Sequence, residues 1–422
     1  MKTRLISTVI IAILFATTMV AQSFDLSAES RSRFENKNGY KTLIAPGIDG
    51  SNFISQRTRL NFGYKNTKLK MKISMQNVRV WGDVSTLSSN DNNSSLHEAW
   101  GEAILSDKIS LKLGRQEIVY DDSRIFGNVG WAQQARSHDA FLFKFKPDVN
   151  NRIDVGVALN SDSQAGTDLL YSNVAGYKTF QYAWYHGSFE NYKLSFLGLN
   201  TGIEFLNTSA EQEVDYMQTV GPRVTYKNGK LTANVATYFQ MGEVATTKVN
   251  ALYYAGNVGF KVAEDLNLGL GYEYLSGKSQ DPSSTNADIE SFAPLFGTNH
   301  KFNGWMDYFY VGNHGGSVGL KDINAIISYK KDKFSVKLIP HLFSAAADVY
   351  NGTTKMDAKL GTEIDLTLGY KIAKDITLNA GYSKMLATDT MEQLKGGDKD
   401  ENNSWAWLMF TFKPNLFSHN AK

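Results

Sequence analysis

The chain has 422 residues, a formal net charge of +2 and no cysteine. The missing thiol groups exclude disulfides, cysteine nucleophiles, iron–sulfur clusters and thiolate zinc sites, and the near-neutral charge argues against a dedicated nucleic-acid binder. The mean hydropathy of −0.31 is compatible with a membrane protein built from strands, because only every second residue of such a strand faces lipid.

The first predicted element is a secretory signal peptide over residues 1–21. Lys2 and Arg4 give it a positive start, and the apolar stretch Leu5–Ala16 is followed by small residues that offer a cleavage point. This apolar stretch is shorter than the about 20 residues that a transmembrane helix needs. The sequence therefore predicts export of a mature chain, residues 22–422.

Strict alternation of apolar and polar residues then runs from Ser23 to Phe412. In Leu69–Gln76, for example, Leu, Met and Ile alternate with Lys, Ser and Gln. A strand with one face on an apolar surface and the other in water has this pattern. We count about eighteen such segments, an even number as bacterial barrels require. The first two cover Ser23–Glu35 and Ile54–Tyr64, and the others centre near Ile73, Trp100, Leu111, Phe143, Val157, Tyr182, Phe196, Val224, Val235, Tyr254, Leu270, Ile326, Val336, Leu366, Leu378 and Leu408.

The connections fall into two alternating classes. Short turns such as Lys65–Lys68 follow every second strand, and Asn228-Gly229 is a strong hairpin signal. Long polar loops such as Asp121–Ala135 and Ser276–Gly316 lie between these turns. This order predicts an all-β fold over residues 22–422: one closed antiparallel transmembrane β-barrel with short periplasmic turns and long extracellular loops. The barrel would lie in the outer membrane of a Gram-negative cell and contact its lipid.

Strand parity directs more basic than acidic side chains toward the lumen. The bases with this parity are Arg31, Arg33, Arg57, Arg59, Lys70, Lys72, Lys112, Lys144, Arg152, Lys193, Arg223 and Lys337. The acids with this parity are Asp25, Glu29, Asp154, Glu273, Glu363 and Asp365. Because Arg and Lys in a low-dielectric pore favour anions, the excess predicts a porin that passes anionic solutes passively. Ion pairs that only tie neighbouring strands together are the alternative.

The first two strands carry the densest group of these bases, with Arg31, Arg33, Arg57 and Arg59 close together. Like charges at this spacing repel one another, so we expect Glu29 or an acid from an inward-folded loop to pair with them. Replacing Arg57 and Arg59 by Ser would then shift the selectivity toward cations and leave the barrel folded.

Two stretches are more specific than the alternation. The first begins at Gly114-Arg115-Gln116 and continues with Arg124, Trp131, Arg136 and Asp139. The second contains Gly297, His300, Gly304 and Asp307. Both resemble the alginate export family of outer-membrane proteins. Members of that family carry a Gly-Arg-Gln strand end, a loop with Arg and Trp, an Arg…Asp strand start and a later Gly…His…Gly…Asp loop.

The resemblance implies an eighteen-stranded barrel that passes an anionic polysaccharide through a constriction rich in arginine, held by inward-folded loops. Transferred by motif position, the implied guiding residues are Arg115, Arg124, Arg136 and Asp139, and His300 and Asp307 belong to the second motif. Arg115 is an open point, because strand parity directs it toward lipid unless a β-bulge turns it inward.

The histidines give no sign of an enzyme. None of the seven lies in a nucleophile-elbow or paired-histidine metal pattern. We therefore expect no catalysis, no cofactor and no dedicated metal site. A barrel hydrolase and a structural or adhesion barrel are the alternatives to a channel, and the acidic segments Asp121-Asp122 and Asp398–Glu401 leave cation binding open.

Overall fold

The structure is a computed structural model that describes residues 22–90, 93–164, 166, 170–171 and 176–420. The expected signal peptide, residues 1–21, lies outside the described residues. Within them, no helix has both the length and the apolar character needed to cross a membrane.

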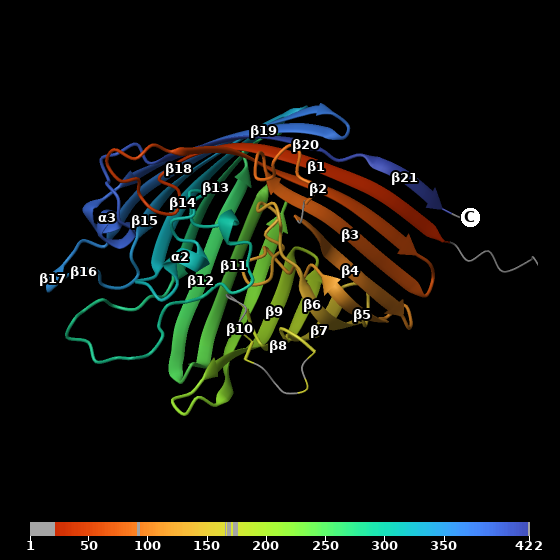
Figure 1. The fold of residues 1–422 in the computed structure, drawn as a ribbon, viewed down its shortest axis with the longest axis horizontal. Coiled ribbons are helices and arrows are strands. Elements are labelled where there is room, and N and C mark those ends of the chain that lie inside the picture. Colours follow the sequence, from red (N-terminus) through yellow and green to blue (C-terminus); the bar gives the residue numbers. More distant parts are fainter. Residues whose placement is uncertain (1–21, 91–92, 165, 167–169, 172–175, 421–422) are drawn as a thin grey trace, which may run out of the picture.

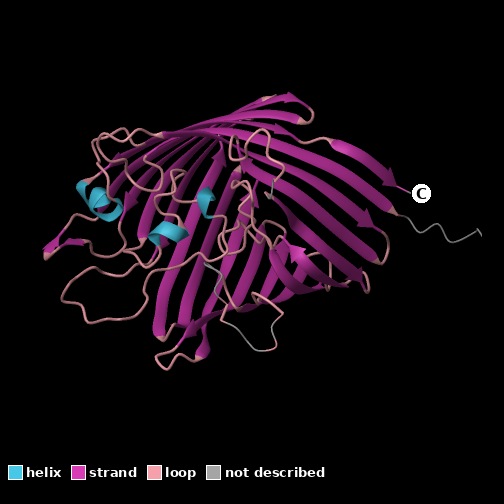
Figure 2. Ribbon diagram, in the orientation of Figure 1, coloured by secondary structure: helices cyan, strands magenta, loops and turns pink. Residues whose placement is uncertain are grey.

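The described residues form eighteen antiparallel strands that close into one barrel (Figures 1 and 2), so the predicted closed antiparallel barrel is confirmed. Each predicted strand centre lies in a different one of these strands. In chain order they are β1 (Ser23–Asn38), β2 (Ser51–Lys65), β3 (Leu69–Val80), β4 (Ser94–Ile104), β5 (Ile109–Gln116), β6 (His138–Phe145), β7 (Asn151–Leu159), β8 (Thr179–Phe189), β9 (Tyr192–Leu206), β10 (Gln212–Asn228), β11 (Leu231–Val244), β12 (Thr247–Lys261), β13 (Leu266–Leu275), β14 (Leu320–Lys331), β15 (Phe334–Ser344), β18 (Lys359–Ala373), β19 (Ile376–Ala387) and β20 (Ser404–Phe412).

The barrel closes where β1 pairs with β2 on one side and with β20 on the other. The alternation predicted that the sheet ends at Phe412, but the sheet continues beyond this residue. Pro414 has no N–H and interrupts the ladder, and the chain then continues as β21 (Asn415–Asn420), which pairs with the first residues of β1, Ser23–Ser27. β20 and β21 therefore cover successive halves of the same edge of β1.

The connections at one end of the barrel are short, for example residues 66–68 and 374–375. The other end carries the long segments, but two connections there, residues 207–211 and 245–246, are also short. They differ from the expected long loops because they join β9 to β10 and β11 to β12, strands of 14 to 17 residues that run on beyond the alternating pattern. We call these two ends the turn side and the loop side.

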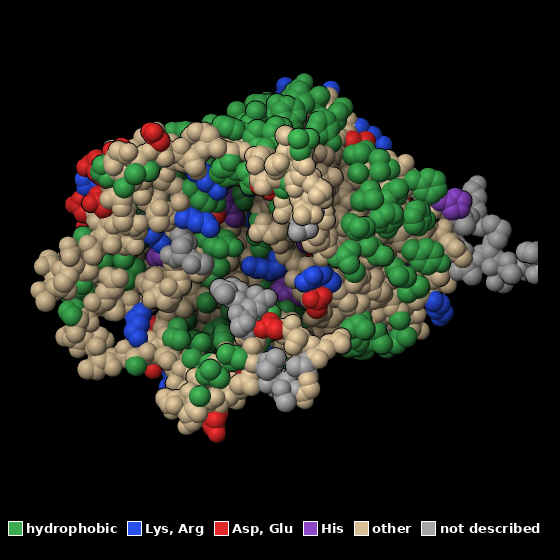
Figure 3. Space-filling view, viewed as in Figure 1, with side chains coloured by type: hydrophobic (Ala, Val, Ile, Leu, Met, Phe, Trp, Pro, Cys, Tyr) green, Lys and Arg blue, Asp and Glu red, His purple; other side chains and the backbone are tan. Residues whose placement is uncertain are grey.

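The alternation sorts side chains between the wall's two faces. In β1, Arg31 and Arg33 are buried inside, whereas Phe24 and Phe34 are exposed on the outer face. Apolar side chains cover the outer face of many other strands, for example Ile73 and Met75 of β3 and Leu268 and Leu270 of β13. Figure 3 shows broad hydrophobic areas at the top and right of the view, over the region of β19, β20 and β1–β4.

Two loops fold into the lumen and meet there. We call residues 117–137, between β5 and β6, the first inner loop, and residues 276–319, between β13 and β14, the second inner loop. The Gly127 N–H donates to Phe296 O (2.9 Å), and the Thr298 N–H donates to Ser123 O (2.8 Å). The second loop contains the short helices η1 (Asn299–Lys301) and α2 (Val311–His314).

The remaining short elements lie on the loop side: a hairpin of β16 (Tyr350–Asn351) and β17 (Thr354–Lys355), and helix α3 (Asp389–Lys395), whose N-cap Thr388 accepts a hydrogen bond from the Met391 N–H. The apolar core lies where the inner loops pack on the wall, with Phe126, Phe180, Met306 and Trp405 almost fully buried.

Candidate functional site

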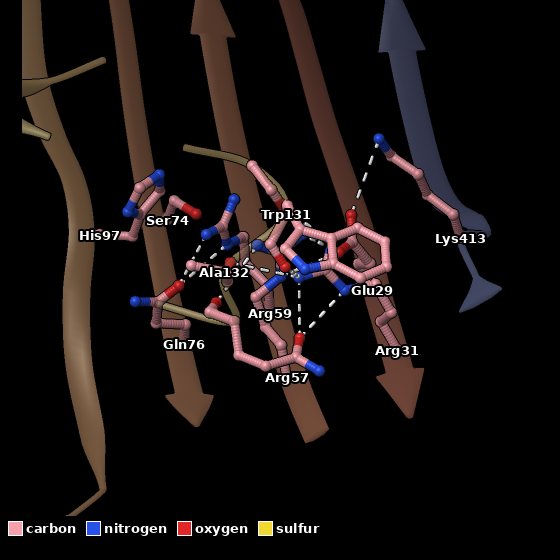
Figure 4. Close-up of polar contacts among 12 residues, drawn as sticks. Glu29, Arg31, Arg57, Arg59, Ser74, Gln76, His97, Trp131, Ala132 and Lys413 are labelled. Carbon is pink, nitrogen blue, oxygen red and sulfur yellow. Dashed lines mark hydrogen bonds and ion pairs between the residues drawn. The ribbon is translucent and has the colours of Figure 1, made fainter. Parts of the chain in front are cut away.

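The tip of the first inner loop lies against the arginines of β1 and β2 (Figure 4). Because Arg31 pairs in register with Arg57, both side chains point into the same part of the lumen. Arg31 donates to Gly130 O (2.8 Å), Trp131 O (3.0 Å) and Ala132 O (3.3 Å) and reaches Gln133 Oε1 with two nitrogens (3.0 and 2.8 Å). One guanidinium therefore holds four successive residues of the loop.

The neighbouring arginines extend this contact. Arg33 donates to Trp131 O (2.8 Å) and to Glu35 Oε1 (2.9 Å), and its guanidinium carbon lies 4.0 Å from the centre of the Trp131 ring. Arg57 donates to Gln133 O (3.2 Å) and pairs with Glu29, as expected. Hydrogen bonds of charged groups contribute about 1.5–3 kcal/mol each, so this network fixes the loop tip firmly.

The arginine group keeps an excess of positive charge. Arg59, the fourth member, donates to Gln76 Oε1 (2.7 Å), a neutral acceptor. Glu29 and Glu35 are the acids that pair with the group, and the other acceptors described above are loop carbonyls and amide oxygens. Of the two expected kinds of acidic partner, Glu29 is present, and the loop supplies backbone carbonyls and the Gln133 amide oxygen in place of an acid.

An aromatic cluster joins the loop tip to the second inner loop. Trp131 stacks on His300 with ring centres 4.9 Å apart and also contacts Trp405 and Trp407 edge-on. His300 Nδ1 lies 2.8 Å from Asp307 Oδ1, and the Tyr40 hydroxyl donates to the same carboxylate. Burial raises the pKa of Tyr40 well above its usual range, and the neighbouring Asp307 adds to this shift.

A cavity of about 490 Å³ opens above this cluster on the loop side. We call it the loop-side cavity. Its charged lining has one more Lys or Arg than Asp or Glu, and the lining also contains aromatic rings. The lining includes Arg33, Lys37, Lys41, Arg79, Tyr40, Phe53, Trp131 and Tyr310, together with the acids Glu35, Asp83 and Asp307. Such a lining can pair with carboxylates and stack on flat apolar faces of a solute.

The remaining motif residues meet where the two inner loops touch. Arg124 is buried and contacts Asn303 Oδ1 (2.9 Å) and Glu273 Oε1 (3.1 Å). Arg136 donates to Gly297 O (3.1 Å), and burial lowers the pKa of its guanidinium. A Cβ on Gly297 would lie 2.2 Å from Arg124 O, so the close contact of the loops requires glycine there.

Arg223 of β10 lies in the lumen, as parity predicts, and pairs with Asp122 at the start of the first inner loop (2.5 Å). Its NH2 group also donates to Asn234 Oδ1 (2.9 Å). Arg223 therefore fixes the base of the loop, and the arginines of β1 and β2 fix its tip.

Arg115 and Asp139 correct the expected site. They face each other across β5 and β6 and form an ion pair (3.3 Å) on the outer face, with 46% and 60% of their side chains exposed. β5 contains no bulge opposite β6 that could turn Arg115 inward, so strand parity holds. The motif position transferred from the resemblance therefore misplaced these two residues relative to the pore.

Replacing Arg115 by Ala should leave ion selectivity unchanged and lower the stability of the barrel by less than about 1 kcal/mol, because exposed ion pairs contribute little. Reversal potentials and the temperature of heat-modifiable gel migration measure the two effects. A clear change in selectivity would contradict the outward position of this side chain.

Sequence reasoning missed several inward acids: Glu35, Glu98, Glu102 and Asp322. Parity could have found Glu35, which follows Arg31 and Arg33 at every second position. The inward position of Glu98 could not be predicted from alternation. The pairing of β3 with β4 shifts register between Ser74 and Met75, so His97 and Glu98 both point inward although they are adjacent in the chain.

Of the described residues, His97, Glu98 and Glu117 are the group whose ligand atoms lie within 4.8 Å of one another, as a metal site requires. Protein donors already occupy these atoms. His97 Nε2 lies 2.7 Å from Glu117 Oε1, Trp100 Nε1 donates to Glu98 (3.0 Å), and the Lys72 ammonium also pairs with Glu98. Through His97 and Glu117 this group connects β4 to the first inner loop, and the Lys72 ammonium supplies the positive charge beside Glu98.

Comparison with known proteins gives one family and one fold. The family model described as alginate export matches residues 22–406, whereas no curated protein matches the sequence significantly.

Three crystal structures are similar in fold. A BenF-like porin from Pseudomonas fluorescens Pf-5 has 12% identity and a TM-score of 0.62, and the match covers 93% of this chain and 99% of that chain. OccAB4 from Acinetobacter baumannii has 12% identity and a TM-score of 0.63 (96% of this chain, 100% of that chain), and OpdK from Pseudomonas aeruginosa with vanillate has 13% identity and a TM-score of 0.58 (94% of this chain, 99% of that chain). At these identities the likeness concerns the fold alone.

Proposed function

The chain belongs to the alginate export family, and from this membership we propose that it forms a passive anion channel in the outer membrane of a Gram-negative cell. The turn side would face the periplasm and the loop side the exterior, as is usual for bacterial barrels. The apolar outer face of the closed barrel supports membrane insertion, because closure leaves no unpaired edge in lipid.

One observation carries the preference for anions. The four arginines of β1 and β2, three of which hold the tip of the first inner loop, have Glu29 and Glu35 as their acidic partners, and they lie directly below the loop-side cavity. A solute that enters from the loop side would meet this positive potential where the inner loops narrow the lumen. Fixed charge at a narrow, low-dielectric passage favours ions of the opposite sign.

An anionic polysaccharide is the second candidate cargo, supported by the family match. The aromatic rings of the loop-side cavity suit the apolar faces of sugar rings. A polymer would need a continuous path, however, and the buried contact between Gly127 and Phe296 joins the inner loops across the lumen. Small carboxylates fit the observed cavity without displacement of either loop, and vanillate, which accompanies OpdK, is a suitable probe.

Planar bilayers test the proposal directly. The purified full chain should give stable ohmic conductance, and its reversal potential in a salt gradient should show anion preference that weakens at high ionic strength because salt screens the fixed charge. Vanillate or a soluble oligouronate should reduce the chloride current from the loop side.

A silent bilayer, or preference for cations, would contradict the channel proposal. Lipase or peptidase activity with a silent bilayer would favour the barrel hydrolase instead, and a silent bilayer without such activity would favour a structural or adhesion barrel.

A further inference from the structure

A second charged cluster lies on the lumen face of the wall, separated from the arginines of β1 by β19 and β20, and it has the opposite sign. Five titratable side chains from the consecutive strands β13, β14, β15 and β18 point into the lumen and are at most 6% exposed. They are Glu273, Asp322, His341, Glu363 and Asp365. We call them the acidic cluster. Neither the family motif nor the proposed selectivity explains it.

The acidic cluster holds the second inner loop through its backbone. The Trp305 N–H donates to Asp365 Oδ2 (3.1 Å), and the Met306 N–H donates to Glu363 Oε1 (2.8 Å). Asn303 donates through its amide to Glu273 and Asp322. Three of the four residues 303–306 thus donate hydrogen bonds to the carboxyl groups.

Gly304 allows the close approach. Its φ is +81°, and a Cβ there would lie 2.6 Å from the Glu363 carboxyl carbon. The same segment continues to Asp307 and His300, which meet Trp131 of the first inner loop. Release of residues 303–306 would therefore loosen the contact that narrows the lumen.

The cluster has fewer cations than carboxyl groups. Arg124 pairs with Glu273 (3.1 Å), and His341 lies 2.9 Å from Asp322 and 3.6 Å from Asp365. The other titratable groups that face it are Asp307 and Tyr308 of the second inner loop, Lys337 of β15 and Tyr253 of β12, whose hydroxyl donates to Glu273 (2.6 Å). Glu363 contacts neither Arg124 nor Lys337 within ion-pair distance in the described residues.

Glu363 and Asp365 are neighbouring inward positions of β18 and are both fully buried, and their carboxyl groups accept from the successive Met306 and Trp305 N–H groups, which places the two carboxyl groups side by side. The Ser383 hydroxyl donates to Asp365, whereas no donor from the described residues reaches Glu363 Oε2. Two buried carboxylates in contact cannot both stay ionised at low cost. If Glu363 Oε2 carries a proton and forms a hydrogen bond to Asp365, this oxygen gains a partner and the repulsion between the two carboxylates disappears.

We propose that Glu363 and Asp365 share one proton and that this protonated pair latches the second inner loop into the lumen, so that the channel opens as the pH rises. The gating rests on the proposed channel function, whereas the latch itself is a property of the fold. Loss of the proton leaves two adjacent buried charges, which water can relieve only when residues 303–306 move away.

The direction of the pH effect follows from the proton count. The latched state binds one proton more than the released state, in which both carboxyl groups are hydrated and ionised. The latched state is therefore favoured at low pH, and the ratio of released to latched states rises by up to about tenfold per pH unit within the titration range of the pair.

Hydrogen exchange of the full-length protein in detergent, measured by mass spectrometry at pH 5 and pH 9 and corrected for the intrinsic exchange rate, tests the latch without requiring conduction. In the parent, protection of the Trp305 and Met306 N–H groups should fall at pH 9. Glu363→Gln should keep protection at both values, because its amide oxygen accepts from Met306 and its NH2 donates to Asp365. Glu363→Ala should lose protection at both.

Glu102→Gln is the matched control. Glu102 is another buried lumen acid, but it contacts Ser110 and Lys144 and neither inner loop, so this variant should behave as the parent does. Heat-modifiable migration confirms that each variant folds. The latch would be overturned if protection of the Trp305 and Met306 N–H groups did not depend on pH in the parent. It would also be overturned if Glu363→Gln showed the same pH dependence as the parent.

Conductance at the same two pH values separates the two proposals. A severalfold rise from pH 5 to pH 9 in the parent, absent in Glu363→Gln, supports the latch as a gate. A silent bilayer with pH-dependent protection contradicts the channel and leaves the latch standing. A conducting protein with pH-independent protection overturns the latch alone.

Discussion

Removal of the tip of the first inner loop should raise the single-channel conductance severalfold. The expected change is replacement of residues 130–134 by Gly-Gly, which deletes the Trp131 ring and every loop acceptor of Arg31, Arg33 and Arg57. The lumen widens because the tip no longer lies between the arginines and the aromatic cluster. The freed guanidiniums should also strengthen the preference for anions, since water and mobile anions replace the carbonyls as their partners.

A deletion of equal length elsewhere on the loop side gives the control. Residues 84–88, after β3, are mostly exposed, and their replacement by Gly-Gly should leave conductance and selectivity near the parent's. Equal conductance of the parent and the 130–134 variant would show that the first inner loop does not limit the passage of ions.

The second large effect is expected from Arg57→Ser combined with Arg59→Ser. Loss of two guanidiniums from a group of four should lower the anion-to-cation permeability ratio severalfold, with reversal potentials in a salt gradient as the measurement. The barrel should stay folded because its backbone ladders are intact. Arg57→Lys with Arg59→Lys keeps the charge and should keep most of the selectivity.

The double Ser variant leaves Glu29 without its Arg57 partner, which by itself favours cations. A triple variant that adds Glu29→Gln removes this contribution, and its selectivity should lie between those of the parent and the double variant. Unchanged selectivity in both Ser variants would show that Arg57 and Arg59 serve only to hold the loop. Guidance of anions would then belong to Arg124, Arg136 and the loop-side cavity.

Strand positions could be predicted because a wall between lipid and water enforces alternation. The prediction weakened at strand ends, where both faces contact water and the pattern disappears. β10, for instance, begins with Gln212, Glu213, Val214 and Asp215, of which three are polar, and it extends to 17 residues. Strand bounds in such regions depend on pairing with β9, which a single segment of sequence does not show.

The site could be predicted only in part. Parity correctly placed Arg31, Arg33, Arg57 and Arg59 inside, and the loop motifs pointed to Arg124 and Arg136. Arg31 and Arg33 bind backbone carbonyls about 100 positions away along the chain, and a carbonyl carries no signal in the sequence. The inward turn of Glu98 depends on a register shift between β3 and β4, which residue types alone do not reveal.

The strand break at Pro414 has a consequence for how the barrel seam is completed. Residues 23–27 of β1 extend beyond the part of β1 that pairs with β20, and an uncovered edge there would present free N–H and C=O groups to any other extended chain. β21 covers this edge, yet it is the last strand in chain order and packs on β1 alone. This part of the seam therefore depends on residues 415–420, and release of β21 would expose the adhesive edge while β20 stays paired with β1.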